Sequence, residues 1–276
     1  MSSAVHSGFE LDGEPSKLKP MLRDLWASRK LLRMLAKKTF LVQYRRASLG
    51  MLWAIGLPLI QALVMVAVIG RIVRFDTSGA PFSAYVLAAI VPWTFFMTAI
   101  QASTTSIVEG SSLATKVYFP RAIFPIVMVL AGVRGLVPGL AIMLGVAAIL
   151  GASMGVAALM IIPATLLMLT LATGFSLVFA ALHVYFRDMR FIVSAATLPW
   201  FWASGVFYPV TVFKSFRRWI ELNPAVGMLE LFRSSIDAAT PGWERSAVIT
   251  AIWAVALMLL ALPLYRRYDR VFVDLL

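Results

Sequence analysis

The sequence predicts an all-α membrane protein with six transmembrane helices. Of its 276 residues, 61% are hydrophobic and 14% are charged, whereas an average soluble domain is roughly 45–50% apolar and about 25% charged. The charges are also segregated, because no Asp, Glu, Lys or Arg occurs in 47–70, 77–108, 122–133, 135–182, 191–213 or 246–265. A helix that crosses a bilayer needs about 20 apolar residues. These ranges therefore exclude an ordinary soluble enzyme.

The uncharged ranges place the six spans in chain order at 50–70, 83–106, 122–150, 155–184, 191–210 and 246–265. The range 135–182 is too long for one helix, and the turn-forming sequence Gly151–Gly155 divides it in two. Most Lys and Arg residues then fall in the termini and in the loops on the same side as the termini. By the positive-inside rule, both termini are predicted to be cytoplasmic in a multi-pass protein of the cytoplasmic membrane.

The segments outside the spans have distinct compositions. Residues 1–20, with mixed charges and prolines, are expected to form a flexible cytoplasmic tail without a cleavable signal peptide. Residues 21–46 place Leu, Trp and Phe at helical spacing opposite Lys and Arg, which predicts an amphipathic helix in the membrane interface; the alternative is a solvated basic helix. The six-span domain is expected to occupy 47–265, and 266–276 a second cytoplasmic tail.

The connection 211–243 is expected to form short external helices that re-enter the bilayer as a gate. Aromatic and aliphatic residues run through it, and Asn223-Pro224 supplies an N-cap followed by proline at the first helical position. Two short amphipathic helices should meet at this pair. Protein around them would shelter their polar backbone groups from lipid.

Residues that carry chemistry are scarce in this chain. The predicted spans contain no Asp or Glu, which argues strongly against proton coupling and less strongly against sodium coupling through backbone carbonyls. The chain has only two histidines, His6 and His183, and no cysteines, so we expect no metal site. It also lacks the paired carboxylates that would indicate a catalytic site. Because no Gly-Lys dipeptide occurs, the phosphate-binding GxxxxGK[ST] motif is absent, and any ATP and Mg²⁺ must be bound by a partner protein.

Four short motifs occur in the order seen in a known family. Tyr44-Arg45 precedes Ser48-Leu49-Gly50, Trp53 and Pro58; Lys116–Arg121 follows the second span; Phe186-Arg187-Asp188 ends the fourth; and Asn223-Pro224 precedes Phe232-Arg233. From about residue 22 to 274 the chain thus resembles the permease subunits of ABC transporters that export polysaccharides and polyol-phosphate polymers, including the O-antigen type. Within this family it looks most like permeases for lipid-linked galactan in actinobacterial cell-wall assembly.

The resemblance implies that two copies of the chain line a pore and that two ATPase subunits bind on the cytoplasmic face. The substrate would be a lipid-linked polysaccharide, and the +12 net charge is assigned to membrane lipids, not to nucleic acid. The segment 109–121 is expected to couple to the ATPase through Ser112, Lys116, Val117, Tyr118, Phe119, Pro120 and Arg121. The alternative is a short surface helix that joins two spans. Tyr44, Arg45 and Arg46 would mark the interfacial access site.

Arg134 and four aromatic residues are the candidates for the substrate path. Arg134 lies about 18 Å into its predicted span at 1.5 Å per residue, near mid-membrane, where it either receives the pyrophosphate of the lipid carrier or bonds carbonyls freed near Gly135 and Pro138. Trp93, Phe96, Trp200 and Trp202 offer rings on which sugars could pack, although aromatic residues also anchor spans at bilayer interfaces. Two other functions stay open: an ABC permease for a small lipid or drug, and a membrane-embedded glycan-processing enzyme.

Overall fold

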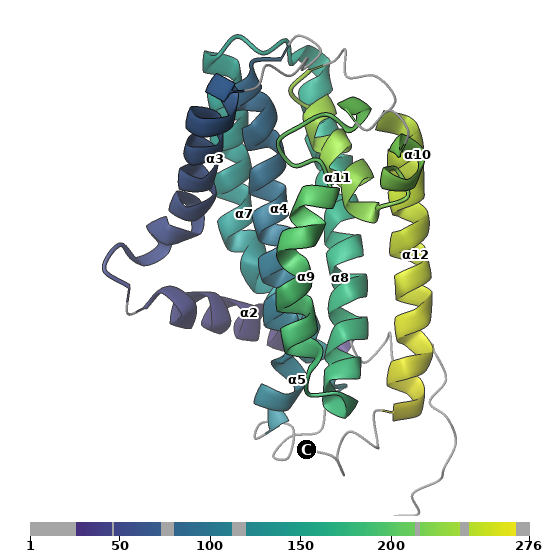
Figure 1. Ribbon diagram of the computed structural model, residues 1–276. Coiled ribbons are helices and arrows are strands. Elements are labelled where there is room, and N and C mark those ends of the chain that lie inside the picture. Colours follow the sequence, from purple (N-terminus) through teal and green to yellow (C-terminus); the bar gives the residue numbers. More distant parts are fainter. Residues whose placement is uncertain are drawn as a thin grey trace, which may run out of the picture.

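The computed structural model describes residues 26–45, 47–72, 80–111, 120–212, 216–237 and 243–268. Every regular element within these ranges is helical, so the all-α prediction is confirmed (Figure 1). Five helices among the described residues are long and apolar enough to cross a membrane. They are α3 (Trp53–Ile72), α4 (Phe82–Thr104), α7 (Ile123–Ile149), α8 (Ile161–Tyr185) and α12 (Trp243–Tyr268).

The helix bounds follow local sequence signals. The 3-10 turns η1 (Gly50–Leu52) and η2 (Gly155–Met160) lead into α3 and α8, and each begins at a glycine with positive φ. Gly151, also at positive φ, ends the turn after α7. These positions explain why 135–182 divides into two helices at the predicted place.

Helix α9 (Met189–Ala203) corrects the prediction of six full spans. Its 15 residues extend about 22 Å at 1.5 Å per residue, which is short of a hydrocarbon core of roughly 30 Å. The helix ends where Gly205 adopts a φ of +62° and the chain turns. Figure 1 shows α9 ending partway along the bundle, with the segment that holds η3 (Val210–Val212), α10 (Arg217–Ile220) and α11 (Pro224–Ser234) beyond it.

Helix α2 (Arg29–Tyr44) runs across the lower part of the bundle in Figure 1 and packs against α7. Ala36 and Phe40 are buried on its inner side, whereas Lys37, Lys38 and Arg45 are exposed. This distribution is the amphipathic pattern that the sequence predicts for the interfacial helix. Residues 21–25 and Arg46, which belong to that prediction, lie outside the described residues.

Helix α10 precedes the Asn223-Pro224 pair, and α11 begins at Pro224 with Asn223 as its N-cap. Helix α11 is buried against α4, α8 and α12. The close approach of α11 to α12 requires Gly227, because a Cβ there would collide with the carbonyl oxygen of Ser246. The hydroxyl of Thr250 also donates to the carbonyl of Pro224 at 2.7 Å. Helix α11 is therefore an internal packing element of the bundle.

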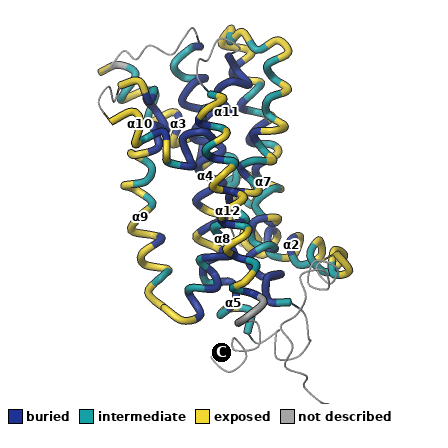
Figure 2. The backbone as a smooth tube through the Cα atoms, turned by 90° about the vertical axis from the view of Figure 1, so that its right-hand side faces the viewer, coloured by how far each residue is buried: buried dark blue, intermediate teal, exposed yellow. Residues whose placement is uncertain are grey.

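Helix α4 is the centre of the molecule. In its apolar stretch 83% of the residues are buried, the highest share among the five long helices, compared with 11% in α3. Helix α4 packs against α3, α7, α8, α9 and α11. Figure 2 shows the contrast with α9, which stands at one edge and is exposed along most of its length. The short helix α5 (Ser106–Glu109) follows α4 at the end of the bundle opposite α11 (Figure 1).

Candidate functional site

A groove of about 550 Å³ lies between α3, α4 and α9. Its polar lining residues are all uncharged and come from the three helices: Gln61 from α3, Thr94, Thr98 and Gln101 from α4, and Ser194 and Thr197 from α9. The remainder of the lining is apolar and aromatic, including Trp93 and Phe201. Such a surface can bind hydroxyl groups and the apolar faces of a ligand without holding a charge.

Hydrogen bonds link the polar groups across the groove. The hydroxyl of Thr94 donates to Gln61 Oε1 at 3.1 Å, which joins α4 to α3. The Nε2 of Gln101 donates to Thr197 Oγ1 at 2.7 Å, which joins α4 to α9. Because the hydroxyl of Thr197 in turn donates to the carbonyl of Val193 at 3.0 Å, its orientation is fixed. Each amide therefore has a partner within the groove.

Helical spacing places these side chains together. Thr94, Thr98 and Gln101 follow one another at four and three residues along α4, which puts them on one face, and Ser194 and Thr197 do the same along α9. None of these residues is among the candidates that the sequence predicts. The available signal was a stripe of uncharged polar residues at helical spacing within apolar spans.

A second, smaller cavity of about 200 Å³ lies between α2, α3, α4 and α7. Thr39 and Gln43 of α2 line it, and it shares Thr94 and Thr98 with the groove. Small residues on α7 make the space: a Cβ at Gly132 would lie 2.9 Å from the ring of Phe95. Thr94 and Thr98 thus line both the groove and the smaller cavity next to α2.

Arg134 is exposed on α7 and lies at the level of α2. Its neighbour Gly135 faces Ala54 and Phe40, since a Cβ at Gly135 would lie 3.0 Å and 3.8 Å from their side chains. The first turns of α7 extend past α2 toward the α5 end of the bundle (Figure 1). Arg134 thus lies near the middle of α7, at the point where α2 packs against it, and its mid-membrane depth stays a prediction. Within the described ranges, no hydrogen bond or ion pair holds the guanidinium, including any to the carbonyls near Pro138.

The predicted aromatic residues separate into two environments. Trp93, Phe96 and Trp200 join Phe175 and Phe201 in one aromatic cluster, in which Phe96 and Trp200 pack edge-to-face with ring centroids 5.5 Å apart. Phe96 is 0% exposed inside this cluster, whereas Trp93 reaches the groove lining. Trp202 is 46% exposed and packs on Phe207. Of the four, the structure places Trp93 alone on the wall of the groove.

The predicted ATPase-coupling segment is described only at its ends. Ser112, Lys116, Val117, Tyr118 and Phe119 lie outside the described residues. Pro120 and the buried Arg121 stand at the start of α7, and Glu109 ends α5. All three belong to the end of the bundle opposite α11.

The predicted access site lies at the end of α2. The ring of Tyr44 packs edge-on against Phe40, with centroids 5.2 Å apart. Burial raises the pKa of the Tyr44 phenol, so this side chain stays neutral. An open hollow of about 630 Å³ beside it is bordered by Lys37, Lys38 and Arg45. Its apolar floor and basic rim suit an anionic lipid headgroup.

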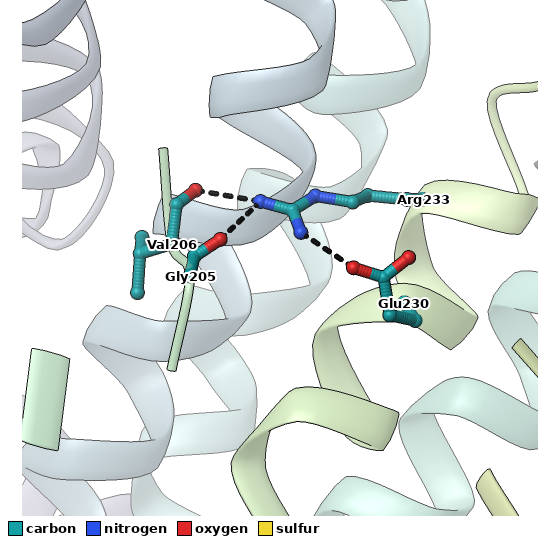
Figure 3. Close-up of polar contacts among 4 residues, drawn as sticks. All are labelled: Gly205, Val206, Glu230 and Arg233. Atoms are coloured by element: carbon teal, nitrogen blue, oxygen red, sulfur yellow. Dashed lines mark hydrogen bonds and ion pairs between the residues drawn. The ribbon is translucent and has the colours of Figure 1, made fainter. Parts of the chain in front are cut away.

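Arg233 of α11 holds the chain that follows α9 (Figure 3). Its Nη2 donates to the carbonyl oxygens of Gly205 and Val206 at 2.7 and 2.8 Å, and its Nη1 pairs with Glu230 at 2.9 Å. The side chain is 1% exposed. Removing a partner from a buried charged group is costly. This contact was missed from the sequence, in which Phe232-Arg233 is part of a family motif without an assigned structural role.

Asn223 links the N-terminal end of α11 to α9 by hydrogen bonds. Its Oδ1 accepts from the backbone N–H of Ala225, as an N-cap does, and also from Trp200 Nε1 at 2.8 Å. Its Nδ2 donates to Ser204 Oγ at 3.0 Å. The wall of the groove formed by α9 is thus positioned from both ends of α11.

These features define the class of protein as a helical membrane protein with several membrane-length helices. The bundle has membrane-length helices and an uncharged groove, and the part of the chain that the structure describes holds no cluster of His, Cys, Asp and Glu that could bind a metal. The chain belongs to the ABC-2 type transporter family, whose family model matches residues 30–236. In this family, a separate protein supplies the ATPase.

Two relatives support this family assignment. The O-antigen export system permease protein RfbA of Myxococcus xanthus is 28% identical over 249 residues, which cover 86% of this chain and 94% of the relative. The O-antigen export system permease protein RfbA of Klebsiella pneumoniae is 22% identical over 250 residues, covering 89% and 95%. The similarity therefore runs through nearly the full length of both proteins.

Proposed function

We propose that this chain is the permease subunit of an ATP-driven exporter that moves a lipid-linked polysaccharide across the cytoplasmic membrane. The observation that carries the proposal is the uncharged polar groove between α3, α4 and α9 in a chain of the ABC-2 family. Amides, hydroxyls and aromatic rings are the groups that bind sugars. The relatives are permease proteins of O-antigen export systems, and O-antigen is a polysaccharide.

Two copies of the chain would enclose the path. The groove is bounded by α3, α4 and α9, and α3 and α9 are largely exposed on their other sides. A second copy facing the groove would convert it into a closed pore. Two ATPase subunits would bind at the α5 end, where the segment 109–121 begins and ends, and this end would face the cytoplasm together with both termini.

The carrier phosphate would bind at the depth of α2. Lys37, Lys38 and Arg45 border the hollow there, and Arg134 lies at the same level without a partner among the described residues. An arginine is a permanent cation with a geometry suited to phosphate. The polymer would then follow its carrier past Thr94 and Thr98 into the groove.

The polymer we propose is a galactan destined for the cell wall, on the basis of the sequence resemblance. Depletion of the chain from its native cells tests both levels of the proposal. Lipid-linked polymer should accumulate, protected from a glycosidase added outside the cells, and its acid hydrolysate should contain galactose. Re-expression of the chain is the control.

The possible outcomes separate the two levels. Accumulation of a polymer of another sugar would overturn the galactan assignment and leave the exporter standing. Normal delivery of all lipid-linked polymers to the outer surface would overturn the exporter. If efflux of a small lipid or drug were lost instead, the permease for small molecules would be the correct function.

A further inference from the structure

We propose that the groove selects an uncharged, hydroxyl-rich polymer and rejects a polyanionic one, with Gln61, Thr94, Gln101 and Thr197 as specificity-determining residues. The inference rests on the proposed function and deepens it. Exporters of the class that the chain resembles carry either polysaccharides or polyol-phosphate polymers. The lining of this groove distinguishes the two by their charge.

None of the described residues that line the groove is charged, and the same holds for the smaller cavity that shares Thr94 and Thr98 with it. A polyol-phosphate polymer has one negative charge in every repeat. Each phosphate in the groove would therefore lose part of its hydration without gaining a cation. Such an uncompensated charge is costly in a membrane interior, and the cost recurs with every repeat.

A neutral polymer brings no uncompensated charge into the groove. The Thr94–Gln61 pair at 3.1 Å and the Gln101–Thr197 pair at 2.7 Å each form one hydrogen bond across the groove. Sugar hydroxyls both donate and accept, so they can replace one partner in each pair without leaving a polar group unsatisfied. The lining can thus exchange its internal hydrogen bonds for bonds to the passing chain.

The free atoms of the two amides fit the same ligand. Nε2 of Gln61 remains as a donor and Oε1 of Gln101 as an acceptor, because among the described residues neither atom has a partner. The ring of Trp93 adds an apolar surface. One donor, one acceptor and a flat ring suit neighbouring hydroxyls on a sugar, and none of the three attracts a phosphate by charge.

The basic residues are separated from this lining. Lys37, Lys38 and Arg45 border the hollow beside α2, and neither cavity that contains Thr94 includes them or Arg134. Within the described ranges, cations are thus available where the carrier pyrophosphate would bind and are missing where the polymer would pass. This separation explains how one subunit could accept an anionic lipid carrier and still select a neutral polymer.

The test is transport into proteoliposomes that contain this chain and its ATPase. Two polymers of matched length are supplied on the same polyprenyl pyrophosphate: a neutral hexose polymer and a glycerol-phosphate polymer. We expect ATP-dependent uptake of the neutral polymer to be about tenfold faster. Thr197→Val should slow neutral uptake several-fold, and Thr197→Lys should raise uptake of the glycerol-phosphate polymer.

Thr170→Val is the matched control. Thr170 is an exposed threonine on α8 whose hydroxyl donates to its own helix, at Leu166, and it does not line the groove, so uptake of both polymers should be unchanged. Equal uptake of the two polymers by the wild-type chain would overturn the selectivity and leave the proposed function standing. Uptake of neither polymer would overturn the proposed function, and the selectivity with it.

Discussion

The guanidinium of Arg233 stacks on the ring of Tyr85, with Cζ 3.8 Å from the ring centroid. This contact joins α11 to the central helix α4, and the same guanidinium binds the carbonyls of Gly205 and Val206 after α9. One buried cation therefore fixes three segments relative to one another. Because α9 forms a wall of the groove, the position of that wall depends on α11.

Replacing Arg233 with alanine should strongly destabilise the protein. The change leaves two buried carbonyls and Glu230 without their partner, and breaking a buried charged network costs about 3 kcal/mol or more. Thermal unfolding in detergent measures the effect. Arg217→Ala is the control, because Arg217 is half-exposed in an i,i+4 pair with Glu221 and such pairs contribute at most about 1 kcal/mol. Similar melting temperatures for the two variants would contradict the role of Arg233.

Gly227→Ala should separate α11 from α12. A Cβ at Gly227 collides with backbone atoms of Ser246, and overpacking of this kind costs about 1–3 kcal/mol. Gly145→Ala on α7 is the matched control, since a Cβ there meets nothing within 4 Å and alanine favours a helix by about 1 kcal/mol over glycine. We expect a lower melting temperature for the first variant and an equal or higher one for the second. The reverse order would show that the α11–α12 contact is loose.

Asn223→Ala should lower both stability and export. The variant loses the N-cap of α11, which contributes about 1 kcal/mol, and also the bonds to Trp200 and Ser204 that position α9. Asn223→Ser restores the cap but is too short to keep the contact with Trp200. Export measured in a depleted strain should therefore stay low in the serine variant while its stability recovers. Full recovery of export by serine would limit Asn223 to capping.

Arg134→Gln should reduce export about tenfold, the loss expected when a phosphate loses a charged hydrogen bond. Arg134→Lys keeps the charge and should restore part of the rate. Arg218→Gln, which removes an exposed cation on α10, serves as the control for net charge. Unchanged export in the glutamine variant would remove Arg134 from the path.

The long helices could be predicted from the sequence because lipid imposes a strong pattern. Uncharged runs mark α3, α4, α7, α8 and α12, and glycines at 151 and 155 mark the turn between two of them. The Asn223-Pro224 pair marks the start of α11 through ordinary capping chemistry. In each case a local rule acts on neighbouring residues, so no knowledge of the tertiary structure is needed.

The groove and the length of α9 could not be predicted in the same way. The uncharged run 191–213 is long enough for a span, yet its helix ends at Ala203 because Gly205 turns the chain and Arg233, distant in sequence, binds the freed carbonyls. Gln61 and Thr197 meet α4 only after three helices pack together. The nearness of Gly135 to Phe40 likewise depends on where α2 crosses α7.

Uptake of lipid-linked polysaccharide by reconstituted vesicles tests whether this chain needs a partner ATPase to move its substrate. Vesicles are prepared with this chain alone, with the chain and its ATPase, and with the chain and an ATPase inactivated at its catalytic site. We expect ATP-dependent accumulation of polymer in the second preparation and none in the other two. Accumulation driven by this chain alone would contradict this expectation.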